Sequence, residues 1–191
     1  MRKYFYLIAF CVSLVSCTKD QMPNDTTFGT PTQTIVAEVD WTQKSEWGGE
    51  WYSDDYAAVT VEQGTGLIID CSSDGTTLYW EPQIPMISHI AEIDEGGQYQ
   101  VKFQFTSPKA GELRLDFYSW DGSGATMASI FEVAEGDNDM TIDFRDYPTS
   151  CTDAGIFYQC GKLPGRHIIR NVQVIDLAGG TRSRASCDNN Q

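Results

Sequence analysis

Positive charge and histidine are scarce in this sequence. Its 191 residues include 13 Lys and Arg against 27 Asp and Glu, a formal net charge of −14, and the two histidines are His89 and His167. No basic cluster offsets this charge, so we expect the chain to repel nucleic acid and anionic lipid headgroups, whereas neutral glycans are unaffected. Because no close Cys pair accompanies the histidines, a zinc site is disfavoured and no metal ligand is predicted.

Motifs for catalysis are also missing. No Ser stands in a nucleophile elbow, and neither His belongs to a plausible triad. Glycoside hydrolysis needs two carboxyl groups at a defined separation, one of them with a raised pKa. An acidic chain offers many candidate pairs by chance, and we expect Asp54, Asp55, Asp116 and Glu132 to be ordinary carboxylates on solvated strands and loops. We therefore expect no enzymatic activity and no catalytic residue.

Helical periodicity is absent from every segment of eleven or more residues. Apolar residues instead recur at every second position, which is typical of strands. The expected strands are 35–39, 57–62, 67–71, 77–84, 98–106, 112–120, 127–133, 140–144, 156–159 and 168–175. Gly-containing turns follow several of them, and Pro82 favours an edge strand or a bulge for 77–84. The pattern predicts an all-β fold, a jelly-roll β-sandwich.

The N-terminus has the composition of an export signal. Arg2 and Lys3 precede a short apolar run that ends in Leu14-Val15-Ser16-Cys17. The run is too short for a permanent membrane helix. Its ending resembles the bacterial lipobox, which implies lipidation of Cys17. The alternative is an ordinary signal peptide in which this Cys stands by chance.

We accordingly divide the chain into four parts. The expected parts are a lipoprotein signal peptide (1–16), a flexible polar tether (17–34), the β-sandwich domain (35–177) and a C-terminal tail (178–191). Lys19-Asp20, just after Cys17, resembles the acidic export tags of surface lipoproteins in Bacteroidetes. We expect a lipid-anchored protein of the outer membrane or cell surface, with the leaflet left open.

Four cysteines remain beyond the signal segment and Cys17. They are Cys71, Cys151, Cys160 and Cys187. An exported protein reaches a compartment that permits disulfides, and four cysteines allow three pairings. Cys151 and Cys160 flank a short segment, so we predict a disulfide bond between them. A second bond from Cys71 to Cys187 stays open.

Strands 98–106 and 112–120 are expected to form a hairpin through a turn that contains Pro108 and Gly111. One face of each strand is apolar, and the other carries amides, charges and aromatic rings. Sugar rings pack their C–H faces on aromatic side chains, while their hydroxyls need fixed donors and acceptors. The predicted carbohydrate-binding residues are Gln104, Arg114, Asp116, Tyr118 and Trp120, with Trp80 and Trp47 from neighbouring segments. Alternatively, Tyr118 and Trp120 lie under a loop as peripheral core.

Three tryptophans, Trp41, Trp47 and Trp51, lie within eleven residues around Gly48-Gly49. Such a cluster suits a loop that presents flat surfaces to a ligand. It equally suits a hydrophobic plug that closes the end of the barrel, because Trp is often largely buried. We favour the plug, and expect at most one of Trp47 and Trp51 to meet a ligand.

From Glu92 to Asp176 the sequence resembles the galactose-binding-like jelly rolls, especially carbohydrate-binding modules of the family 4, 9 and 22 type. The matching segments are Gly97–Phe103 (G-x-Y-x-V-x-F), the following Leu-x-Leu strand, 161–165 and the closing strand 168–174. The resemblance implies that the strand from Arg114 to Trp120 lies on a concave face that binds glycan chains.

The resemblance leaves a structural calcium ion in doubt. Asn171 stands where many such modules have Asp. Oxygen ligands such as Asp40 or Asp176 could still hold the ion, but we predict no cofactor.

The sequence thus predicts a non-catalytic glycan-binding lipoprotein of the cell envelope, with a polysaccharide or oligosaccharide as partner. The alternative is an envelope module that docks to another protein, because exposed Trp and Tyr also anchor protein interfaces. A groove with several polar groups around Trp120 would favour the glycan. A flat apolar patch of several hundred Å² would favour a protein.

Overall fold

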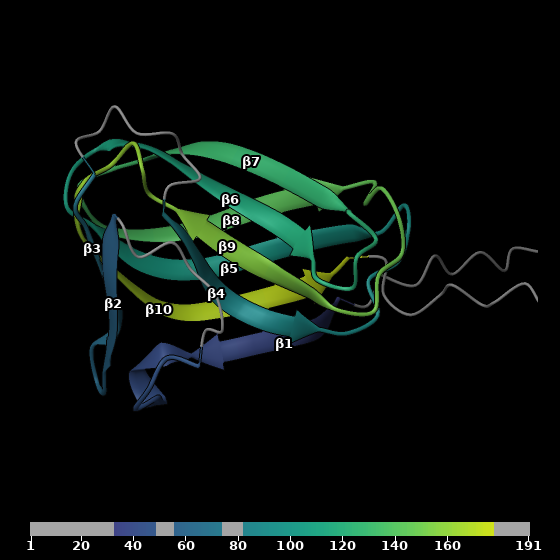
Figure 1. Ribbon diagram of the computed structural model, residues 1–191, viewed down its shortest axis with the longest axis horizontal. Coiled ribbons are helices and arrows are strands. Elements are labelled where there is room, and N and C mark those ends of the chain that lie inside the picture. Colours follow the sequence, from purple (N-terminus) through teal and green to yellow (C-terminus); the bar gives the residue numbers. More distant parts are fainter. Residues whose placement is uncertain (1–32, 49–55, 74–81, 178–191) are drawn as a thin grey trace, which may run out of the picture. The chain divides into compact units, whose positions relative to one another are not determined.

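The computed structural model describes residues 33–48, 56–73 and 82–177 (Figure 1). Within these residues the chain forms ten strands and one short 3-10 helix. They are β1 (Thr34–Asp40), η1 (Trp41–Gln43), β2 (Ala57–Glu62), β3 (Gly66–Cys71), β4 (Gln83–Ile90), β5 (Gln98–Ser107), β6 (Gly111–Ser119), β7 (Thr126–Val133), β8 (Gly136–Arg145), β9 (Ala154–Gln159) and β10 (Gly165–Asp176). No helix in the described ranges is long and apolar enough to cross a membrane.

The strands form two antiparallel sheets that face each other (Figure 1). The larger sheet has the order β2-β3-β10-β5-β8, and β1 also pairs with β10. The smaller sheet has the order β4-β9-β6-β7. The long strand β10 holds the larger sheet together, because it pairs with β3, β1 and β5. The chain is therefore an all-β two-sheet sandwich, and the predicted fold class is confirmed.

The inner faces of both sheets supply the core. Tyr99 from the larger sheet and Phe117 from the smaller one meet edge to face, with ring centroids 5.6 Å apart. Phe144 packs on the same Phe117 ring, also at 5.6 Å. All three side chains are buried, and each such side chain contributes roughly 1.5–3 kcal/mol through burial.

The hairpin predicted for 98–106 and 112–120 is wrong. β5 pairs with β8 and β10 in the larger sheet, whereas β6 pairs with β7 and β9 in the smaller one. The turn at 107–111 therefore crosses between the sheets. Since both strands direct their apolar residues to the shared core, their polar faces lie on opposite sides of the sandwich.

The disulfide predicted between Cys151 and Cys160 is also wrong. Both are buried, and they stand before and after β9. An extended strand of six residues spans about 20 Å, whereas the Cβ atoms of a disulfide lie about 4 Å apart. Cys187 lies outside the described residues, as do Cys17 and the predicted signal peptide and tail.

Candidate functional site

The outer face of the smaller sheet gathers polar and aromatic side chains from three strands. In β6, Leu113, Leu115 and Phe117 point to the core, so the residues between them point outward. The register places Gln159 of β9 opposite Arg114 and Phe157 opposite Asp116. On the far side of β9, Gln83 of β4 lies opposite Gln159. The β6–β9 face, as we call it, comprises Arg114, Asp116, Tyr118, Trp120, Phe157, Gln159 and Gln83.

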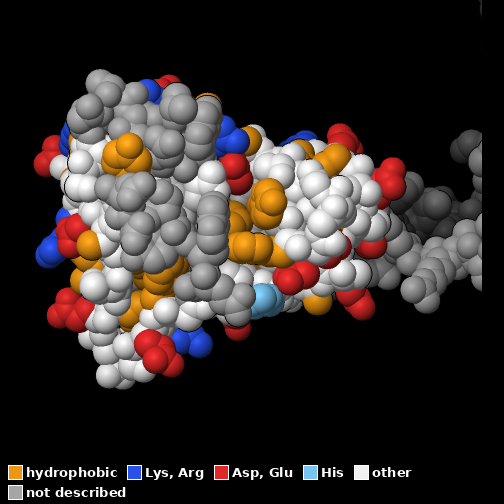
Figure 2. All heavy atoms as spheres, viewed as in Figure 1, with side chains coloured by type: hydrophobic (Ala, Val, Ile, Leu, Met, Phe, Trp, Pro, Cys, Tyr) orange, Lys and Arg blue, Asp and Glu red, His pale blue; other side chains and the backbone are white. Residues whose placement is uncertain are grey.

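Three rings of this face form an aromatic cluster. The rings of Tyr118 and Trp120 are 5.8 Å apart, and each contacts Phe157, at 5.7 Å and 5.2 Å. Together with Gln83 they line a pocket of about 470 Å³. Phe157 is buried at its base, while Tyr118 is 40% exposed. Hydrophobic side chains gather over the smaller sheet in the space-filling view (Figure 2).

Trp120 is held in position by the neighbouring strand. Its backbone N–H donates to the Asp153 carbonyl oxygen at 2.8 Å. Its indole lies over Gly155, where a Cβ atom would approach Trp120 Nε1 to 2.7 Å, so the position requires glycine. The indole N–H is buried and has no hydrogen-bond partner among the described residues.

A polar network borders the aromatic cluster. Arg114 donates two hydrogen bonds to the Asp116 carboxylate, from Nε at 2.6 Å and from Nη2 at 3.0 Å. Such a forked, charge-assisted pair fixes both side chains. Their side chains are only 21% and 11% exposed. Because the two charges balance, this pair forms a rigid donor–acceptor array that adds no net charge to the face.

Gln159 completes this network. Its Nε2 donates to Asp116 Oδ2 at 2.8 Å. A carboxylate only accepts hydrogen bonds, so the amide NH₂ must face Asp116 and the amide oxygen must point away. This Gln159 Oε1 atom is buried and has no hydrogen-bond partner in the described part of the chain. The Trp120 donor and the Gln159 acceptor are thus both enclosed in the face, without a hydrogen-bond partner among the described residues.

Neither a family model nor a curated protein matches the sequence. Solved structures do match. BiXyn10A CBM1 in its apo form has a TM-score of 0.59 at 16% identity, covering 73% of this chain and 96% of that one. The second N-terminal cellulose-binding domain of Cellulomonas fimi β-1,4-glucanase C has a TM-score of 0.54 at 14% identity. This match covers 76% of this chain and 95% of that domain. The CBM22-1 xylan-binding domain of Paenibacillus barcinonensis Xyn10C has a TM-score of 0.50 at 11% identity. This match covers 75% of this chain and 95% of that domain.

The two-sheet β-sandwich of this chain matches the fold of these binding domains. At these identities the likeness concerns the fold, and the function must be argued from the site itself. The structure brings together four of the residues that the sequence singled out, which are Arg114, Asp116, Tyr118 and Trp120. Trp80 lies outside the described residues.

Gln104 does not join this group. It is exposed on β5, on the outer face of the larger sheet, where its Oε1 accepts a hydrogen bond from Asn171 Nδ2 at 2.9 Å. Its placement follows from the crossing of the 107–111 turn between the sheets.

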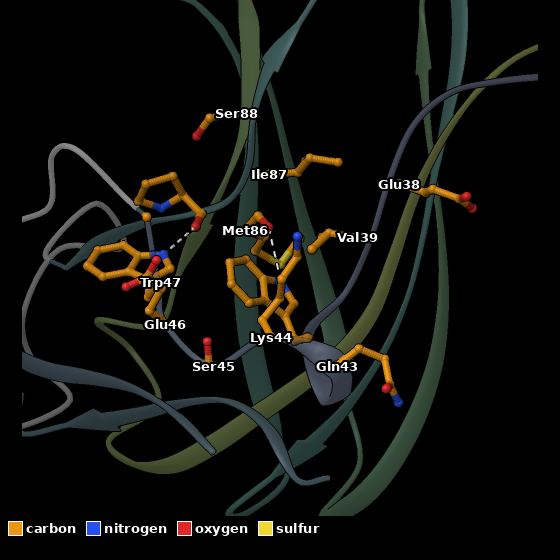
Figure 3. A pocket seen from close by; sticks show the side chains of 13 residues that line it. Glu38, Val39, Gln43, Lys44, Ser45, Glu46, Trp47, Met86, Ile87 and Ser88 are labelled. Carbon is orange, nitrogen blue, oxygen red and sulfur yellow. Dashed lines mark hydrogen bonds between the residues drawn. The ribbon is translucent and has the colours of Figure 1, made fainter. Parts of the chain in front are cut away.

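Trp47 lines a different pocket, of about 510 Å³, beside β4 (Figure 3). β4 is an edge strand of the smaller sheet, and two indoles bond its carbonyl oxygens. Trp47 Nε1 donates to Pro85 at 3.2 Å, and the buried Trp41 donates to Met86 at 3.1 Å. Both rings thus cover a strand edge that would otherwise expose backbone acceptors. Trp51 lies outside the described residues.

Phe157 and Gln159 were missed from the sequence. Every residue of β9 is buried, so the strand shows no alternation that would mark an outward face. Only the register with β6 places these two side chains in the site.

Of the two candidate calcium ligands, Asp40 has one carboxylate oxygen engaged in hydrogen bonds within the protein. Asp40 Oδ1 caps η1, accepting from Thr42 N at 3.0 Å and from Thr42 Oγ1 at 2.6 Å. Within the described ranges no group of three or more His, Cys, Asp or Glu side chains could hold a metal ion.

Proposed function

We propose that the β6–β9 face binds a neutral polysaccharide or oligosaccharide, and that the protein is a non-catalytic glycan-binding lipoprotein of the cell envelope. The observation that carries this proposal is the aromatic cluster of Tyr118, Trp120 and Phe157, which lines a pocket of about 470 Å³ beside the hydrogen-bonded network of the same face. Aromatic rings beside fixed polar groups suit a ligand that has both C–H faces and hydroxyls. This combination favours a sugar over an apolar surface.

Each part of the face has a role in this proposal. The rings of Tyr118 and Trp120 pack against the C–H face of a sugar ring. Gln83, which lines the same pocket, offers its side-chain amide to the sugar hydroxyls. Arg114 and Asp116 hold Gln159 in place. Because their charges balance and the whole chain is acidic, the site favours uncharged sugars over anionic ones.

The proposal also includes the location of the protein in the cell. The lipobox-like ending at Cys17 would place acyl chains on the first residue of the mature protein, and each buried methylene contributes about 0.8 kcal/mol to anchoring. The polar segment 17–34 would then hold the sandwich away from the membrane. We propose an outer-membrane or cell-surface location of the Bacteroidetes type.

A glycan array, followed by isothermal titration on a Cys17→Ser chain without residues 1–16, tests the function. We expect binding to one class of neutral polysaccharide. The Trp120→Ala and Tyr118→Ala variants should each lose at least about tenfold in affinity, equivalent to about 1.4 kcal/mol. Gln104→Ala, on the opposite face, is the matched control and should bind normally. If no plant, host or microbial glycan binds, the result would instead favour docking to an envelope protein.

A further inference from the structure

Two cysteines from different sheets meet at one end of the core. Cys71 is the last residue of β3 in the larger sheet, and Cys160 directly follows β9 in the smaller sheet. Cys71 Sγ lies 3.4 Å from the Cys160 carbonyl oxygen. Next to them, Ser73 Oγ donates to the Gly161 carbonyl oxygen at 2.8 Å. The two segments are therefore held together at this point by direct contacts.

The two thiols also contact each other. The hydrogen bond from Cys160 lowers the pKa of Cys71, whereas burial raises the pKa of Cys160 well above its usual range. Cys71 is only 5% exposed and Cys160 is fully buried. A reagent in solution therefore has little access to either sulfur in the folded domain.

Neighbouring groups argue against a catalytic or metal-binding role for the pair. His167, a candidate base on the adjacent strand β10, has both ring nitrogens engaged. Its Nε2 lies 2.7 Å from the Leu163 carbonyl oxygen, and its Nδ1 lies 2.9 Å from Tyr158 Oη. The carbonyl only accepts, so Nε2 carries the hydrogen and Nδ1 accepts from Tyr158. His167 thus has no nitrogen left to activate a thiol.

We propose that Cys71 and Cys160 form a disulfide bond in the exported protein and covalently join the two sheets. The proposal rests on export to an oxidising compartment and is independent of what the β6–β9 face binds. It replaces the Cys151–Cys160 pairing predicted from sequence spacing, because contact in the fold, and not distance along the chain, decides which thiols pair.

The oxidant is a reactive disulfide, such as that of a thiol–disulfide oxidoreductase or oxidised glutathione. The Cys71 thiolate attacks one sulfur of that disulfide, which forms a mixed disulfide and releases the other sulfur as a thiolate. The Cys160 thiolate then attacks Cys71 Sγ and releases the second sulfur. In sum, two protein thiols lose two protons and two electrons, and the oxidant becomes a dithiol or two thiols. Since both sulfurs are buried, the reaction takes place while the chain folds.

The bond would link residues 89 positions apart. A disulfide that closes so long a loop strongly reduces the conformational entropy of the unfolded chain, and this stabilises the folded state. It would also fix the end of β9 directly after Gln159. Reduction should therefore lower the melting temperature by about 10 °C.

Peptide mapping of the full mature chain, exported to the periplasm of a bacterial host, tests the proposal. The protein is unfolded in an alkylating agent without reductant and then digested. We expect a linked peptide pair that contains Cys71 and Cys160, with Cys151 alkylated. Alkylation of both Cys71 and Cys160, or linkage of either to Cys187 or Cys17, would overturn the proposal.

Melting temperatures with and without reductant give a second measurement. The wild type and Cys151→Ala should both lose about 10 °C on reduction. Cys71→Ala and Cys160→Ala should melt lower and not respond to reductant. An equal response in all four proteins would contradict the assignment. Peptide mapping of the wild type decides the question even if a variant fails to fold.

Discussion

Acid should destabilise the sandwich through His167, which lies between the two sheets. Burial is the main cause that lowers the pKa of His167 from its usual 6.5 to about 4. Between these values the unfolded chain binds the proton more readily than the folded one, so stability falls as pH falls through this window. Each unit of difference between the unfolded and folded pKa values is worth about 1.4 kcal/mol. The lowered pKa of His167 therefore corresponds to a loss of about 3 kcal/mol in the free energy of unfolding by about pH 4.

Urea unfolding at a series of pH values, followed by Trp fluorescence, measures this loss. The wild type should lose about 3 kcal/mol of unfolding free energy between about pH 7 and about pH 4. His167→Gln should be less stable at neutral pH but should lack this part of the pH dependence. Carboxylates with lowered pKa, such as Asp70 and Asp143, contribute only at lower pH, because their usual value is 3.8.

Tyr158→Phe tests whether burial, and not the hydrogen bond to Tyr158, keeps the pKa of His167 low. The variant removes the hydrogen bond to Nδ1 and keeps the ring buried. Since burial dominates, Tyr158→Phe should retain most of the acid-induced loss. An identical pH dependence in the wild type and His167→Gln would refute the reasoning.

Two further predictions concern the candidate site. In Gly155→Ala the new Cβ would lie 2.7 Å from Trp120 Nε1 and 3.0 Å from the Ile87 carbonyl oxygen. We expect a loss of about 1–3 kcal/mol in stability and a shift in Trp emission; Gly48→Ala, which meets nothing within 4 Å, should change neither. Gln159→Met keeps the shape of the side chain but removes its hydrogen bond to Asp116, so the network beside the aromatic cluster loosens. We expect about tenfold lower glycan affinity in isothermal titration and a loss of about 1–3 kcal/mol in stability, because the buried Asp116 loses one hydrogen bond. Unchanged affinity would exclude Gln159 from the site.

The alternation of apolar residues predicted which side of each strand faces the core. Leu113 and Phe117 are buried as their spacing indicates, and Arg114 and Tyr118 therefore lie on the outer face. Spacing alone could not tell which sheet a strand joins. A turn such as 107–111 has the same composition whether it closes a hairpin or crosses the core. For this reason the sequence placed Gln104 beside Arg114, although the two lie on opposite faces of the sandwich.

The position of β9 inside the smaller sheet explains why the sequence did not reveal Phe157 and Gln159. It also explains why the candidate site is rigid. It pairs with β4 on one side and β6 on the other, so its outward residues are buried by their neighbours and resemble core in the sequence. The same pairing holds Gln159 before any ligand arrives. The fork between Arg114 and Asp116 adds to this order, and ordering side chains is one of the main costs of binding. A site already fixed in this way avoids that cost, so substitutions that loosen β9 should weaken binding even where they leave every contacting side chain in place.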